Sequence, residues 1–231
     1  MSTDHAELTK RTDVFNYEHP TVFSFLGEAG CYQALDLTGA VELLHNAVRD
    51  TIDYNVFNVP LHDALSASEV ATHGSGFCLH KSLLFVAGCR RLGVPAVLCS
   101  DVVTNHVADQ AMLELVGGEE FLHWYTRIHL GGRWLKAAPI FNTLLCSLSG
   151  MEVLRFDPEA DSIEQAYGNG STMRFQRTER HYPDPSMTEL LNVIEERHPR
   201  MITTTGRTPT SQFLRSSSRF DAARGGSDVA R

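Results

Sequence analysis

Apolar residues recur at helical spacing in three stretches of this 231-residue chain. In residues 40–52 they fall on one stripe, which predicts an amphipathic helix, and Thr38 stands where an N-cap is expected. A second helix is predicted to begin near Cys78 and to end at Gly93, a residue type that favours the position after a helix. Residues 185–198 have the pattern of a third, moderately amphipathic helix.

Other stretches have the short, β-branched character of strands. Residues 95–103 are apolar enough for a buried strand, and residues 151–163 and 172–185 are each expected to contain a strand. Residues 121–141 predict a β-hairpin with Gly131-Gly132 as its two-residue turn. In that hairpin, residues whose numbers sum to 263 would lie opposite each other, so His123, Tyr125 and Arg127 would share a face with Lys136 and Ala138.

The remaining segments set the expected domain limits. Residues 55–73 read as a loop with one short helical piece. We expect a flexible N-terminus over 1–12, one catalytic domain over 13–200, and a polar, disordered tail over 201–231. No internal repeat is evident.

Composition and charge narrow the function classes. The chain is 42% hydrophobic and 21% charged, as in ordinary globular proteins. Its formal net charge of −8, without a basic stripe, argues against a nucleic-acid partner. No apolar run approaches the roughly 20 residues of a membrane span, and no signal-peptide pattern opens the chain. Five scattered cysteines, an odd number, favour a reduced, cytoplasmic location.

Cys78 stands where a thiol can be activated. It opens a predicted helix directly behind Gly74 and Gly76, which leave room for an approaching acyl group. The positive end of the helix dipole lowers the pKa of a thiol, and the thiolate is the nucleophile in cysteine catalysis. The unpaired N–H groups of the first turn can also receive an oxyanion.

A base must come from elsewhere in the chain, and His123 is the best candidate because a short hairpin holds its strand rigid. General-base catalysis needs heavy-atom distances of about 3 Å, so rigid placement matters. Taken alone, a cysteine at a helix start or a histidine on a strand is more often structural. Their combination, followed by a glycine turn and a tryptophan, favours catalysis. We expect four residues to line the oxyanion or substrate site: Gly76, Phe77, Asn105 and Trp124.

With these residues in place, the chain resembles the transglutaminase-like part of the papain-type superfamily. The matching features are G-x-C opening a helix, the helix exit CRRLGVPAV, the histidine strand FLHWYTRIHL and the turn GGRW, within residues 15–165. The resemblance implies an α+β fold in which a central helix bearing Cys78 packs on an antiparallel sheet bearing His123. It implies Cys78 as the nucleophile and His123 as the group that accepts and returns its proton.

One position departs from the family pattern. The triad usually includes an aspartate before a proline, and Ala138 occupies that position here. A bacterial branch of the family resembles this chain in carrying K-A-[AT]-P-x-F-N, which makes Asn142 a candidate to orient the imidazole. Alternatively, Asp157 or Asp161 supplies a carboxylate, or the third member has been lost.

The implied reaction is acyl transfer through a thioester on Cys78, by amide or peptide hydrolysis or by transamidation. Two alternatives stay open: a natural-product enzyme that off-loads or cyclises an acyl chain held by a carrier protein, and an inactive binding domain. The acyl partner is thus a small molecule, a peptide or an acyl carrier protein. No cofactor is expected, because His73, Cys78 and His80 lack the repeated spacing of a zinc site. Lys81 is expected to be an exposed helix lysine.

Overall fold

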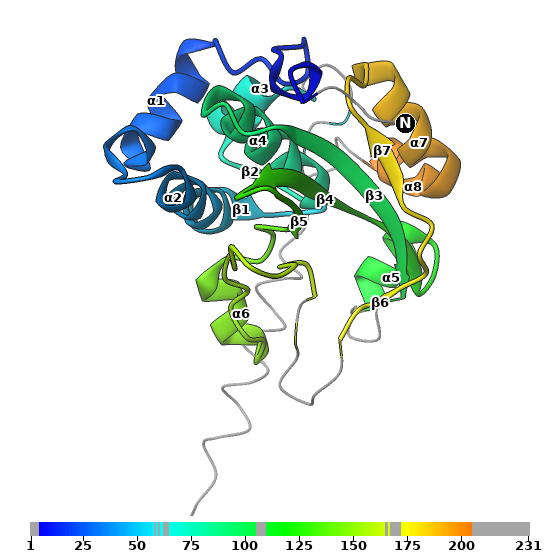
Figure 1. Ribbon diagram of the computed structural model, residues 1–231. Coiled ribbons are helices and arrows are strands. Elements are labelled where there is room, and N and C mark those ends of the chain that lie inside the picture. The colour runs from blue at the N-terminus through cyan, green and yellow to red at the C-terminus, as the bar shows by residue number, and fades with distance from the viewer. Residues whose placement is uncertain are drawn as a thin grey trace, which may run out of the picture.

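The protein folds as helices packed around one antiparallel sheet, as its computed structural model shows (Figure 1). The structure describes residues 5–57, 59, 61, 65–104, 110–164, 166 and 172–204, without the side chains of 203 and 204. Its α-helices within these residues are α1 (Pro20–Glu28), α2 (Leu37–Thr51), α3 (Ala67–His73), α4 (Cys78–Arg91), α5 (Gln110–Val116), α6 (Thr143–Ser149), α7 (Met187–Arg197) and α8 (Pro199–Thr204). Short 3₁₀ helices cover Glu7–Thr9 and Cys31–Gln33.

The main sheet has the order β5-β4-β3-β6, and β7 pairs with β3 beside β6. Its strands are β3 (Ala96–Thr104), β4 (Glu120–Leu130), β5 (Arg133–Ala137), β6 (Arg174–Phe175) and β7 (Arg180–Tyr182). All of their pairings are antiparallel. A separate parallel pair joins β1 (Asp53–Tyr54) to β2 (Ser75–Gly76), just before α4.

Helix α4 is the central element. It packs on β3 and β4 and is covered by α2 and α3, so its residues are buried from Cys78 to Arg90 (Figure 1). The approach of α2 is close enough to require Gly88, because a Cβ there would lie 2.6 Å from Leu44 Cδ2. Gly93 follows the helix with φ +79°, as expected of a glycine after a helix end. The predicted α+β class, with the cysteine helix packed on a sheet that carries His123, is confirmed.

Helix α2 begins three residues earlier than its pattern suggested. Its N-cap is Asp36, whose Oδ1 accepts a hydrogen bond of 2.7 Å from the Gly39 N–H, so the prediction of Thr38 as the cap was wrong. A carboxylate caps better than a threonine hydroxyl and also favours the positive end of the helix dipole. The predicted apolar stripe is confirmed, since its four members are buried: Val41, Leu44, Val48 and Ile52.

The hairpin has the predicted register. Strand β4 pairs with β5 from Thr126↔Ala137 to Leu130↔Arg133, and every pair sums to 263. Gly131 and Gly132 have φ values of +58° and +80°, which only glycine adopts without strain in such a two-residue turn. On its other side β4 runs along the whole of β3.

Two expectations for strands changed in the structure. Residues 151–163 form no regular strand among the described residues; Ser162 makes a single bridge to Ala137, held by the hydrogen bond from Ala138 N–H to Ser162 O. Residues 172–185 form β6 and β7 as two short strands, interrupted at Arg177, whose φ is +60°. Both segments follow the edges of the sheet, where curvature limits how long a strand can stay paired.

The described structure reaches beyond residues 13–200 at both ends. Leu8 is buried, and Arg90 donates a hydrogen bond of 2.9 Å to Lys10 O, which holds the N-terminal segment against α4. At the other end α8 runs to Thr204, and residues 205–231 of the expected tail lie outside the described residues. None of the helices described is long and apolar enough to cross a membrane.

Candidate active site

Cys78 is the first residue of α4, and its thiol lies among backbone N–H groups. The N-cap residue, Phe77, makes no side-chain cap, so the N–H groups of the first turn remain open for other acceptors. The backbone N–H groups of Trp124, Leu79 and Cys78 itself lie near the thiol and act to lower its pKa. The sulfur therefore sits between the start of α4 and the strand β4.

Gly76 permits this arrangement. A Cβ at position 76 would lie 2.4 Å from His80 Cβ and 2.7 Å from His80 Cγ, which is closer than atoms can approach. The lack of a side chain allows β2 to run directly over the first turn of α4. Gly76 O accepts a hydrogen bond of 3.0 Å from Asn55 N–H, which ties this approach to the segment after β1.

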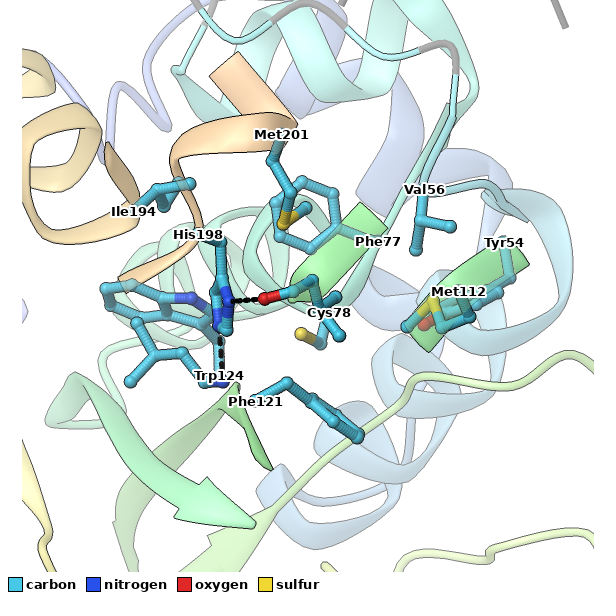
Figure 2. Close-up of a pocket in the computed structure, with 12 residues that line it drawn as sticks. Tyr54, Val56, Phe77, Cys78, Met112, Phe121, Trp124, Ile194, His198 and Met201 are labelled. Carbon is cyan, nitrogen blue, oxygen red and sulfur yellow. Dashed lines mark hydrogen bonds between the residues drawn. The ribbon is translucent and has the colours of Figure 1, made fainter. Parts of the chain in front are cut away.

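The thiol faces a narrow pocket of mainly apolar side chains (Figure 2). Phe77 and Trp124, both expected at the site, line it together with Cys78. The other lining residues are Tyr54, Val56, Met112, Val116, Phe121, Leu122, Ile194, His198 and Met201. The cavity volume of about 20 Å³ is enough for one water molecule but not for an acyl substrate.

The C-terminal helices cover this pocket. Figure 2 shows three residues of this segment at the pocket: Ile194 on α7, Met201 on α8 and His198 between the two helices. His198 anchors them: its Nε2 accepts a hydrogen bond of 2.9 Å from Leu122 N–H, and its Nδ1 lies 2.8 Å from Val116 O. Because Nε2 accepts, the proton belongs on Nδ1, and the ring is neutral. His198 is thus fully engaged as an anchor in this conformation.

His123 lies on β4 next to Trp124, but its ring occupies the other face of the sheet. It is 2% exposed and stands among Tyr125 and Phe175, with ring centroids 6.4 Å and 5.8 Å away. The thiol contacts the peptide N–H of Trp124, which is the peptide bond joining it to His123. The backbone of His123 therefore lies beside the sulfur, although its side chain is not among those that line the pocket.

Burial decides the protonation states of these two groups. It raises the pKa of Cys78 to about 11, despite the backbone hydrogen bonds that favour the thiolate. The expected lowering by the helix start is therefore outweighed in this closed conformation. Burial also lowers the pKa of His123 to about 4, and the nearby Asp101 partly opposes it. At pH 7 the thiol and the imidazole are both neutral here.

Three of the proposed third members make local hydrogen bonds. Asn142 Oδ1 accepts 2.8 Å from Leu145 N–H as the N-cap of α6. Asp157 Oδ1 accepts 2.7 Å from Glu159 N–H, and Asp161 Oδ1 accepts 2.8 Å from Lys136 N–H. None of these bonds involves His123. Ala138 is buried just beyond the end of β5, and Asn105 lies outside the described residues.

Three residues near Cys78 or His123 have positions that the sequence did not predict. Asp101 lies directly opposite His123 in the β3–β4 register, and its signal was a lone carboxylate within an apolar strand. His198 had no recognisable signal, because its partners are backbone atoms far away in the chain. Lys81, expected on the surface, is fully buried, and its Nζ donates to Arg49 O (2.9 Å) and Ile52 O (2.6 Å) at the end of α2.

Within the part of the chain that the structure describes, no group of three histidine, cysteine, aspartate or glutamate residues could hold a metal ion. The chemistry available at the pocket is that of a thiol, backbone N–H groups and nearby histidines.

The chain thus places a cysteine at the start of a buried helix and a histidine on the antiparallel sheet against which that helix packs. Residues 29–139 match the family model of the transglutaminase-like superfamily, and this segment includes both Cys78 and His123. No curated protein matches the sequence significantly.

Two solved structures are similar in part. A candidate cysteine protease from Cytophaga hutchinsonii is 14% identical with a TM-score of 0.44, over 79% of this chain and 54% of that one. A candidate protease from Parabacteroides distasonis is 10% identical with a TM-score of 0.37, over 77% of this chain and 32% of that one. The chain thus spans about half and a third of their lengths.

Proposed function

We propose that this protein is a transglutaminase-like cysteine enzyme that transfers acyl groups through a thioester on Cys78. The observation that carries the proposal is the convergence of backbone N–H groups from α4 and from Trp124 on one thiol. Groups so placed can stabilise the oxyanion of a tetrahedral intermediate. The family match over residues 29–139 supports the same reaction class.

In the first half-reaction, the Cys78 sulfur attacks the acyl carbonyl carbon while His123 takes the thiol proton. The bond to the leaving group then breaks, His123 returns the proton to that group, and a thioester remains on Cys78. Water or an amine attacks the thioester with His123 as base, which regenerates the thiol. Hydrolysis and transamidation share these steps and differ only in the acceptor.

In the closed conformation the thiol is covered and both the thiol and the imidazole are neutral, so conformational changes must precede the reaction. The C-terminal helices have to move for an acyl group to enter, and the His123 imidazole has to come within hydrogen-bond reach of the thiol, which requires a change at this end of β4. Because neither group is charged beforehand, the proton moves as the sulfur attacks. The base then carries a positive charge in a buried position, which makes its electrostatic partner important.

The pocket lining favours an uncharged acyl chain. Phe77, Phe121 and Trp124 surround the thiol together with Met112 and Met201, and none of the described lining residues has an acidic, lysine or arginine side chain. An apolar lining of this kind offers no partner for a charged substrate group near the sulfur. A peptide, a small amide and a chain carried by another protein all present such an acyl group.

The rival function is an inactive binding domain, favoured by Ala138 and by the covered thiol. Iodoacetamide labelling at pH 6 to 7, read peptide by peptide in a mass spectrometer, separates the two. The catalytic proposal predicts that Cys78 is labelled faster than Cys89 and Cys99, whose buried thiols have pKa values raised by burial. It also predicts that His123→Ala slows the labelling of Cys78. Equal rates at all three cysteines would favour the binding domain.

A further inference from the structure

Asp101 is a buried carboxylate that lies directly across from His123. Strands β3 and β4 are neighbours in the sheet (Figure 1), and their register pairs Asp101 with His123. Residues paired in this way have their side chains on the same face of the sheet. Directly opposed Cβ atoms in antiparallel strands are about 4.5–5.5 Å apart. Asp101 is 3% exposed and His123 is 2% exposed. A carboxylate so deeply buried needs partners to stay charged.

The known partners of Asp101 all use one of its oxygens. Oδ1 accepts hydrogen bonds from Val102 N–H (2.8 Å), Thr178 N–H (2.7 Å) and Thr178 Oγ1 (2.8 Å). Among the described residues, no donor bonds to Oδ2. His123 Nε2 is likewise buried without a hydrogen-bond partner among the described residues. Asp101 Oδ2 and His123 Nε2 can therefore each form a further hydrogen bond.

We propose that Asp101, on β3, is the positioning carboxylate of His123, in the role that the family gives to the residue at Ala138. It accepts a hydrogen bond from one ring nitrogen and so fixes the tautomer in which the other nitrogen is free to take the Cys78 proton. Its negative charge balances the imidazolium that forms. This inference rests on the proposed function, since it needs His123 to act as the base.

The sheet explains why the carboxylate comes from β3. The β4–β5 ladder ends at Thr126↔Ala137, three residues beyond His123, so β5 has no residue opposite the imidazole. On the other edge, β3 pairs with β4 along its full length, and Asp101 is the position that meets His123. An opposite charge within about 4–6 Å favours the charged form by about 1–3 pKa units.

A purely structural role for Asp101 is the alternative. Its bonds to Thr178 hold the turn between β6 and β7, next to Arg177 with its φ of +60°. Asp101→Asn separates the two roles, because the amide oxygen can still accept from Thr178 and Val102 while the negative charge is lost. Glu179→Gln is the matched control, since Glu179 is a carboxylate of the same sheet face that pairs with Arg127, Lys136 and Tyr125 instead.

The test is the rate of Cys78 alkylation by iodoacetamide at pH 7, divided by the rate at pH 9.5. A change in access to the thiol alters both rates equally and cancels, whereas a weaker base lowers only the rate at pH 7. Asp101→Asn is expected to lower the ratio at least about tenfold, the effect of one pKa unit. Glu179→Gln is expected to leave it within about twofold, and His123→Ala to lower it about 100-fold or more.

If Asp101→Asn leaves the ratio unchanged while His123→Ala lowers it, Asp101 only holds the turn and the inference is wrong. If His123→Ala also has no effect, the proposed base itself is wrong. If Asp101→Asn does not fold, the inference is tested in the wild-type protein by the ¹⁵N NMR chemical shifts of the His123 ring. One dominant tautomer with a slowly exchanging ring N–H supports the role of Asp101, and a mixture of tautomers contradicts it.

Discussion

Replacing His198 with alanine is expected to open the C-terminal helices and expose the Cys78 thiol. The substitution removes the partners of Leu122 N–H and Val116 O, which lie 2.9 Å and 2.8 Å from the ring nitrogens. Each buried backbone group left without a partner costs about 1–3 kcal/mol, so the loss of both partners destabilises the covered state by about 2–6 kcal/mol. At 1.4 kcal/mol for each factor of ten, the open population rises about 30-fold or more.

The assay is the rate of Cys78 alkylation at pH 9.5, followed by peptide mass spectrometry, because this rate is proportional to the open population when opening is fast. Arg200→Ala is the matched control: its Nη1 donates 2.8 Å to Glu114 O at the exposed surface, and its loss is expected to change the rate less than about fivefold. A His198→Ala protein with a lower thermal midpoint and an unchanged Cys78 rate would refute the covering role of α7 and α8.

Three further outcomes follow from the structure. Burial lowers the pKa of Lys81 to about 7 from an ordinary 10.5, so folding disfavours its charged form. The unfolding free energy of the wild type should therefore rise by about 3 kcal/mol from pH 7 to 9.5 relative to Lys81→Met in urea titrations, and a constant difference would contradict a titrating Lys81. Gly76→Ala forces its Cβ against His80 and should cost about 1–3 kcal/mol in the same titrations, whereas Gly39→Ala, whose Cβ meets its nearest atom at 3.4 Å, should be neutral or stabilising. Truncation after Thr204 should leave the thermal midpoint nearly unchanged, and a large drop would show that the tail packs on the domain.

Local sequence patterns predicted several elements of the fold correctly. The stripe of α2, the glycine turn of the hairpin and the glycine after α4 each depend on residues a few positions apart, and the structure contains all three. The cap of α2 was misread because Asp36 and Thr38 are both good caps, and only the helix start decides between them. Residues 151–163 have a strand-like pattern but form no regular strand, because pairing at the edge of the sheet depends on the distant strand β5, which a local pattern does not describe.

The electrostatic features of the site depend on long-range pairing. Asp101 meets His123 across a connection that includes α5, and no short-range rule gives the register of β3 on β4. Lys81 and His198 are held by carbonyl and N–H groups, which every residue has, so the sequence offers no sign of them. The neutral state of Cys78 follows from burial in a pocket that α7 and α8 help to line, and the pocket residues of these helices lie more than 100 residues further along the chain.

The central claim is that Cys78 forms the acyl-enzyme with His123 as its base. The most direct measurement incubates the protein with a simple alkyl thioester and follows the intact mass and the modified peptide over time. The account predicts one acyl group on Cys78 and none in Cys78→Ala. It predicts that His123→Ala lowers the acylation rate by a factor of about 100 or more. Acylation spread over Cys31, Cys89, Cys99 and Cys146, or a His123→Ala rate equal to that of the wild type, would contradict it.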